Sequence, residues 1–106
     1  PILGDREQRA ITPVAILEAT SKMFDFTVDD ICGQSRRRPL VTARQIAMYL
    51  CRELTDLSYP AIADVFGGRD HTTVIHAVRK IETLMKERRQ IYDQVTELIE
   101  TIKAGE

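Results

Sequence analysis

Two adjacent glycines, Gly67 and Gly68, separate two stretches of helical pattern and constrain the fold more than any other feature of this sequence. A short helix is predicted over 58–66, where Pro60 is tolerated because first-turn N–H groups have no intrahelical partners. A longer helix is predicted over 71–85. Because a tight, glycine-containing turn between two apolar-faced helices is the form of a helix-turn-helix, the pair predicts that motif.

The rest of the chain is also helical in pattern. Thr12, Thr27 and Ser58 are N-cap residues by type and position. Further helices are predicted over 13–24, 27–32, 42–54 and 89–103. We find no strand alternation, internal repeat or low-complexity tract, so the expected fold class is all-α, with about six helices.

Length and composition fit one globular domain. The chain has 106 residues, 43% apolar and 29% charged, and no apolar run approaches the roughly 18 residues that a membrane span needs. The segment 1–8 carries Asp5, Arg6 and Glu7, which argues against a signal peptide. Two cysteines cannot form a disulfide framework, which favours a reducing compartment and a cytoplasmic location.

Positive charge is concentrated in the middle of the chain. The 15 basic and 16 acidic side chains give a net charge of −1 overall. Residues 35–80 nevertheless hold eight basic and four acidic side chains, whereas both flanking segments are net acidic. This distribution predicts a local anion-binding face.

The predicted helix over 71–85 has two distinct faces. Its apolar stripe consists of Val74, Val78, Ile81 and Met85, flanked by Ile75 and Ala77. The opposite face consists of Thr72, His76, Arg79 and Thr83. A helix face of hydroxyl, imidazole and guanidinium groups without a carboxylate suits the major groove of DNA.

The start of this helix adds a second signal. As N-cap, Asp70 would accept a hydrogen bond from the N–H of Thr72 or Thr73. The free N–H groups and the positive end of the helix dipole then lie beside His71, which favours a phosphate there. Asp70 could instead accept a hydrogen bond from cytosine N4. The alternative is that Asp70 only caps the helix and that His71 is solvated.

The run from Phe66 to Ile81, FGGRDHTTVIHAVRKI, resembles the signature of the C-terminal DNA-binding domain of the bacterial replication initiator family DnaA. The similarity continues upstream in the segments 44–50 and 54–55, and it covers the chain from about Pro13 to its end.

The resemblance implies a Trp-repressor-like helix-turn-helix domain that binds double-stranded DNA at asymmetric AT-rich boxes of the replication origin. The implied base contacts are Arg36, Tyr59, Pro60, Asp70, His71, Thr72 and Thr73. The implied phosphate contacts are Arg37, Arg38, Arg44, Gln45, Arg52, Ser58, Arg69 and Lys80. It also implies a bacterial, nucleoid-associated protein.

The family places one arginine of the loop before the long helix in the minor groove, and Arg36 aligns with that position. A narrow AT-rich minor groove has enhanced negative potential and attracts an inserted arginine. Because Arg36, Arg37 and Arg38 are consecutive here, which of them enters the groove stays open.

The resemblance also sets the expected domain organisation. Residues 1–12 would connect to a preceding ATPase domain outside this chain, and 13–106 would form the DNA-binding domain. No P-loop sequence occurs, so no cofactor and no enzymatic activity are expected here, and ATP would belong to the absent domain. Contacts with other initiator protomers would also run through absent domains.

Other chemistry has less support in the sequence. Cys51 with His71 or His76 could form a nucleophile and its base, but Cys51 fits a packed helix position better. The two histidines lie about 140° apart on a helix, which does not suit one metal ion. Residues 13–24 are amphipathic and could lie on an acidic membrane surface, although packing on the core is the better interpretation. A helical protein-interaction module and another helix-turn-helix regulator also remain open.

Overall fold

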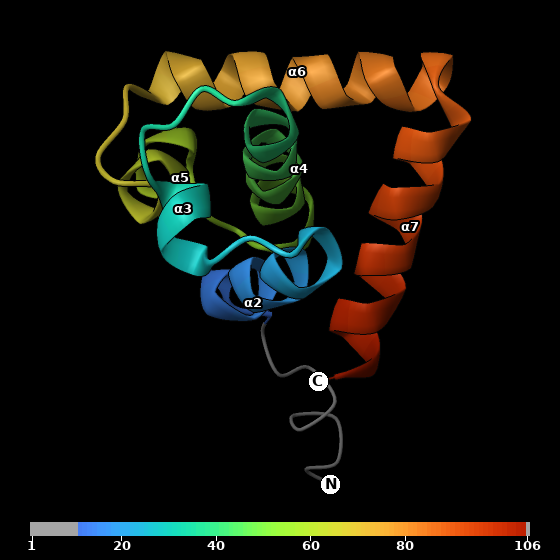
Figure 1. Cartoon of the computed structure of the whole chain (residues 1–106). Coiled ribbons are helices and arrows are strands. Elements are labelled where there is room, and N and C mark those ends of the chain that lie inside the picture. The colour runs from blue at the N-terminus through green and yellow to red at the C-terminus, as the bar shows by residue number, and fades with distance from the viewer. Residues whose placement is uncertain (1–10, 106) are drawn as a thin grey trace, which may run out of the picture.

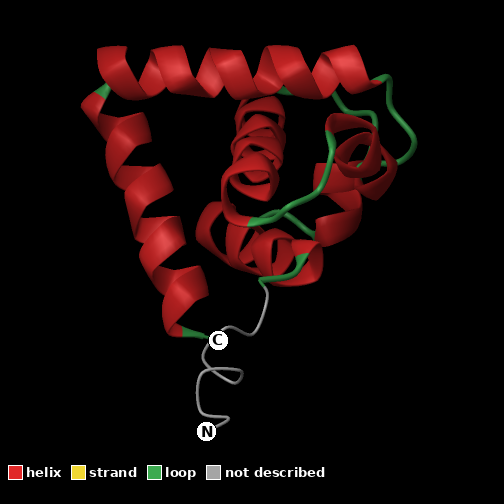
Figure 2. Ribbon diagram, turned by 180° about the vertical axis from the view of Figure 1, so that it is seen from behind, coloured by secondary structure: helices red, strands yellow, loops and turns green. Residues whose placement is uncertain are grey.

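The computed structural model describes residues 11–105, and every regular element in that part is an α-helix. The helices are α2 (Pro13–Phe24), α3 (Val28–Cys32), α4 (Arg38–Leu54), α5 (Tyr59–Val65), α6 (His71–Glu87) and α7 (Arg89–Ala104). Figure 2 shows the same absence of strands between residues 11 and 105. The predicted all-α class is confirmed, whereas most of the predicted connector, 1–10, lies outside the described residues.

Helix α4 is the centre of the domain. It contacts α2, α3, α5 and α6. In Figure 1, α6 runs across the view while α4 is seen nearly along its axis, so the two helices cross steeply. Helices α5 and α7 lie under opposite ends of α6, and α2 packs on α4 away from α6 (Figure 1). One end of α6 is therefore free of α7.

Local capping sets most helix starts, as the sequence predicts. The side-chain oxygens of Thr12, Thr27 and Ser58 each accept a hydrogen bond from the backbone N–H three residues later, at 3.0–3.2 Å. Each bond satisfies one of the N–H groups that a helix start leaves without a partner. The predicted N-caps of α2, α3 and α5 are confirmed.

Helix α4 begins earlier than predicted. The sequence predicts its start at Thr42, whereas the helix begins at Arg38. Pro39 is accommodated in the first turn, where its missing N–H costs nothing. The N–H of Val41 already donates to the carbonyl of Arg37 at 2.8 Å. The basic segment is therefore partly helical.

The core is built where the apolar stripes of α4 and α6 meet. Val74, Val78 and Ile81 of α6 are buried in the same core cluster as Ile46 and Leu50 of α4, and the two helices are in contact. Full burial of such a side chain contributes about 1.5–3 kcal/mol relative to exposure. This stripe orients α6, so its opposite face is turned to solvent.

The turn between α5 and α6 requires its glycines. Gly67 and Gly68 have φ angles of 89° and 77°, in the left-handed region that side-chain-bearing residues rarely adopt. The N–H groups of Gly68 and Arg69 both donate to the carbonyl of Ala63, at 3.0 and 3.1 Å, which closes the end of α5. The predicted double-glycine turn is confirmed.

Helix α2 packs inward. Ile16 and Leu17 are buried, which supports the interpretation that this stripe packs on the core, and Val14 is 61% exposed. No helix within residues 11–105 is both long enough and apolar enough to cross a bilayer.

Candidate nucleic-acid interface

One face of α6 presents polar side chains to solvent. Its members are Thr72, His76, Arg79 and Thr83, all exposed. The adjacent Lys80 is exposed as well. This row contains no carboxylate, as the sequence predicts, and it lies opposite the buried stripe that packs on α4.

The N-terminus of α6 is held by Asp70. One carboxylate oxygen accepts hydrogen bonds from the backbone N–H of Thr72 at 2.9 Å and from its hydroxyl at 2.8 Å. These bonds, the backbone one first, hold the pKa of the Asp70 carboxyl below its usual value. The same oxygen lies 3.6 Å from Nδ1 of His71. The predicted N-cap is confirmed, and His71 and Thr73 stay exposed at the helix start.

A groove runs between the first half of α6 and the start of α4. Its volume is about 280 Å³. It is lined by Arg36, Val41, Arg44, Gln45, Met48, Arg69, Thr73, His76 and Ala77. Three guanidinium groups border this groove and no carboxylate does, so the groove favours an anion. Five of the residues that line the groove are predicted DNA contacts, and His76, which is not among the predicted contacts, lines it as well.

Arg44 has a role that the sequence did not indicate. It is predicted as a phosphate contact, yet its residue is only 6% exposed. Its guanidinium donates to the backbone carbonyls of Ile31 at 2.6 Å, Ser35 at 2.9 Å and Asp30 at 3.1 Å. These bonds tie α3 and the basic segment to α4.

Arg69 lies close to Arg44 in the same groove. Its guanidinium donates to the carbonyl of Gly33, and its buried Nε has no hydrogen-bond partner among the described residues. Burial lowers the pKa of Arg44, and the nearby positive charge of Arg69 lowers it further. Two like charges are thus held together with no acidic side chain lining the groove.

The three consecutive arginines occupy different positions. Arg36 precedes α4 and lines the groove. Arg37 is the N-cap residue of α4, and its guanidinium lies 5.8 Å from the ring centroid of Phe26. Arg38 is the first residue of the helix. Of the three, only Arg36 lines the groove beside α6.

Other predicted contact residues surround the start of α5. Ser58 caps that helix, Pro60 is exposed in its first turn, and Tyr59 is half-buried. The guanidinium of Arg52, from the last turn of α4, lies 4.3 Å from the ring centroid of Tyr59. This contact could not be predicted from helical spacing, because it joins two helices across a loop.

The structure does not favour a cysteine nucleophile. Cys51 is fully buried, and burial raises the pKa of its thiol to about 12. The thiolate that nucleophilic catalysis needs is therefore scarce near neutral pH. Within the described residues, no group of three or more His, Cys, Asp or Glu side chains is placed to hold a metal ion.

The paired helices α5 and α6, their double-glycine turn and the acid-free face of α6 define a helix-turn-helix domain. Residues 13–81 match the family of the bacterial DnaA protein helix-turn-helix. The chain belongs to this family. The matched family model describes the helix-turn-helix domain and not a catalytic domain.

Curated relatives carry the same family name. The chromosomal replication initiator protein DnaA of Leifsonia xyli subsp. xyli is 59% identical over 97 residues, which are 92% of this chain and 20% of that protein. The DnaA of Cutibacterium acnes is 55% identical over 102 residues, 96% of this chain and 20% of that protein. The chain therefore spans about a fifth of the length of these relatives.

A solved structure is also similar. The crystal structure of a DNA replication initiation factor superposes with a TM-score of 0.77 at 33% sequence identity. The similarity covers 97% of this chain and 32% of that one. The helical arrangement described above is therefore similar to that of part of this replication initiation factor.

The internal role of Arg44 gives a stability prediction. Arg44→Met keeps an apolar side chain of similar length but leaves three carbonyls without their donor. We expect the free energy of unfolding to fall by about 2–4 kcal/mol in urea titrations. Arg38→Met, at an exposed position of the same helix, should change it by less than about 0.5 kcal/mol. Equal effects of the two substitutions would contradict the anchoring role.

The cap at Asp70 gives a pH prediction. Because folding lowers the pKa of this carboxyl, its stabilising effect is present above the unfolded-state pKa and is lost as the pH falls through the folded-state value. Asp70→Ala should therefore lower the free energy of unfolding at pH 7, and its difference from the wild type should vanish in strong acid.

Urea titrations between pH 7 and pH 2 measure this difference. Asp70→Asn is the matched control, because an asparagine cap keeps an acceptor at every pH. A difference between Asp70→Ala and the wild type that stays constant with pH would show that the carboxylate does not stabilise α6.

Proposed function

We propose that this chain is a sequence-specific double-stranded DNA-binding domain that reads asymmetric AT-rich boxes at a bacterial replication origin. The observation that carries the proposal is the acid-free groove beside the exposed face of α6, bordered by three guanidinium groups. Membership of the DnaA helix-turn-helix family supports it. The relatives' name, chromosomal replication initiator protein, supports the origin as the site of action.

In this proposal α6 enters the major groove by its N-terminal end. Asp70, His71, Thr72 and Thr73 are exposed there and would contact base edges. The free N–H groups of the first turn would also favour an adjacent phosphate. The opposite end of α6 packs on α7, so it is the end near α5 that is free to enter the duplex (Figure 1).

The basic segment would contact the adjacent minor groove through Arg36. This residue lines the groove beside Thr73, whereas Arg37 and Arg38 form the start of α4. Arg37 and Arg38 would then contact phosphates. Arg44 supports the proposal indirectly, because its hydrogen bond to Ser35 fixes the backbone next to Arg36.

The remaining contacts would be made with the DNA backbone. The proposed set is Gln45, Arg52, Ser58, Arg69 and Lys80, with Pro60 near the groove edge. Five charged contacts, namely Arg37, Arg38, Arg52, Arg69 and Lys80, would release counterions on binding.

Residues 1–12 would link this domain to an ATPase domain, which would bind ATP and contact other protomers. Such a protein would be associated with the bacterial nucleoid in the cytoplasm. The relative from Leifsonia xyli is about five times as long as the segment that aligns with this chain, so it has room for such a domain.

The decisive experiment is a fluorescence anisotropy titration of this chain on an AT-rich duplex with a family-type box and on a scrambled duplex, across a salt series. We expect tighter binding to the box and a slope of log K against log salt of about −4 to −5 on both duplexes. A slope near zero would contradict the electrostatic part of the proposal. Equal affinity for both duplexes would indicate an interaction module or a nonspecific binder.

His71 tests the base contacts. His71→Ala should weaken binding to the box by about 1–3 kcal/mol and binding to the scrambled duplex far less, because base edges carry the sequence information. Gln90→Ala, an exposed substitution on α7, is the control and should change neither affinity. Equal losses on the two duplexes would mean that His71 positions the protein without reading bases.

A further inference from the structure

The closest arginine–aromatic contact in the described chain joins the two helices that precede α6. Arg52 is in the last turn of α4, and Tyr59 is the first residue of α5. The guanidinium carbon lies 4.3 Å from the centroid of the tyrosine ring. This distance is well within the range of about 6 Å for a cation–π contact.

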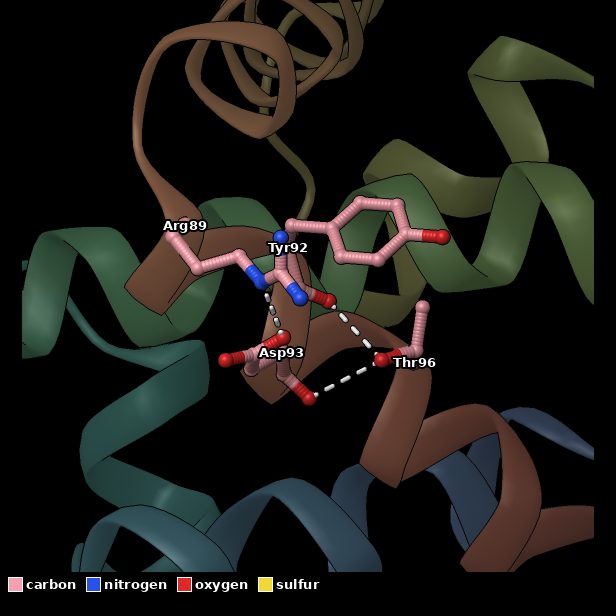
Figure 3. A network of polar contacts seen from close by, with 4 residues as sticks. All are labelled: Arg89, Tyr92, Asp93 and Thr96. Atoms are coloured by element: carbon pink, nitrogen blue, oxygen red, sulfur yellow. Dashed lines mark hydrogen bonds and ion pairs between the residues drawn. The ribbon is translucent and has the colours of Figure 1, made fainter.

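The other two such contacts are longer, and one of their arginines is also ion-paired. Arg37 lies 5.8 Å from the ring of Phe26, and Arg89 lies 6.0 Å from that of Tyr92. Figure 3 shows that Arg89 also contacts Asp93, whose carboxylate lies 3.2 Å from its Nε. Between residues 11 and 105, Arg52 has no carboxylate within ion-pair distance. The ring of Tyr59 therefore contacts a guanidinium that no carboxylate of the described residues neutralises.

The position of the Arg52 guanidinium over the ring affects what this side chain can bind. A guanidinium that packs on a ring with its planar face keeps the N–H groups along its edge free, where they fit two phosphate oxygens. An exposed arginine otherwise loses rotamer entropy when it binds. A ring that already restricts the side chain lowers that cost.

We propose that Tyr59 is a positioning residue that acts through Arg52, holding its guanidinium ready for one phosphate of duplex DNA. This inference rests on the proposed function and deepens it. It differs from the base contact that the family resemblance implies for Tyr59. A base contact would change specificity, whereas a positioned phosphate contact changes the affinity for every sequence equally.

The two roles are separated by a double-mutant cycle measured on the box and on the scrambled duplex. Tyr59→Leu should weaken binding to both duplexes by about two- to fivefold, as expected for loss of an exposed cation–π contact. Tyr59→Phe keeps the ring and should recover most of that loss. In the Arg52→Ala background, Tyr59→Leu should have no further effect.

Two outcomes would overturn the proposal. One is a loss confined to the box, and the other is a loss that persists in the Arg52→Ala background. Tyr92→Leu, which removes the ring beside Arg89 on α7, is the matched control and should leave both affinities unchanged. Circular dichroism establishes that each variant is folded, and Tyr59→Met replaces Tyr59→Leu if leucine unfolds the domain.

The cycle also distinguishes this proposal from the proposed function. A wild-type chain without salt-dependent duplex binding would overturn both. A wild-type chain that binds duplex DNA, with independent effects of Tyr59 and Arg52, would overturn the positioning role alone.

Discussion

The hydrogen bonds of the Arg44 guanidinium are the interaction on which the rest of the candidate interface depends. A charge that is almost fully buried must be surrounded by acceptors, because an unsatisfied buried charge costs far more than its bonds contribute. Here the acceptors are the carbonyls of Asp30, Ile31 and Ser35, which belong to α3 and to the segment before α4. One side chain of the central helix thereby fixes the backbone that carries Arg36.

This anchor has an electrostatic consequence. Arg44 and Arg69 hold like charges close together, and the Nε of Arg69 is buried without a hydrogen-bond partner in the described part of the chain. Such an arrangement lowers the stability of the isolated domain, since no acidic side chain of the groove offsets the repulsion. A bound phosphate would supply the missing negative charge. Functional sites commonly carry this kind of local conflict, which a ligand relieves.

Much of the fold could be predicted because it depends on local rules. The caps at Thr12, Thr27, Ser58 and Asp70 and the turn at the double glycine follow from residue type and spacing alone. Contacts between distant segments could not be predicted in this way. Helical periodicity places Arg44 near a buried stripe but cannot show which carbonyls it meets. The predicted start of α4 is too late, because a proline such as Pro39 can either end a helix or lie in its first turn and the sequence does not decide between the two.

The two glycines of the turn are constrained to different degrees. A Cβ at Gly68 would meet nothing within 4 Å, so only its positive φ opposes a side chain there. A Cβ at Gly67 would lie 3.2 Å from the carbonyl oxygen of Cys32 as well. Over evolutionary time, asparagine, which tolerates left-handed backbone, is a more accessible replacement at the second position than at the first. Substitutions at this turn are therefore expected at Gly68 more often than at Gly67.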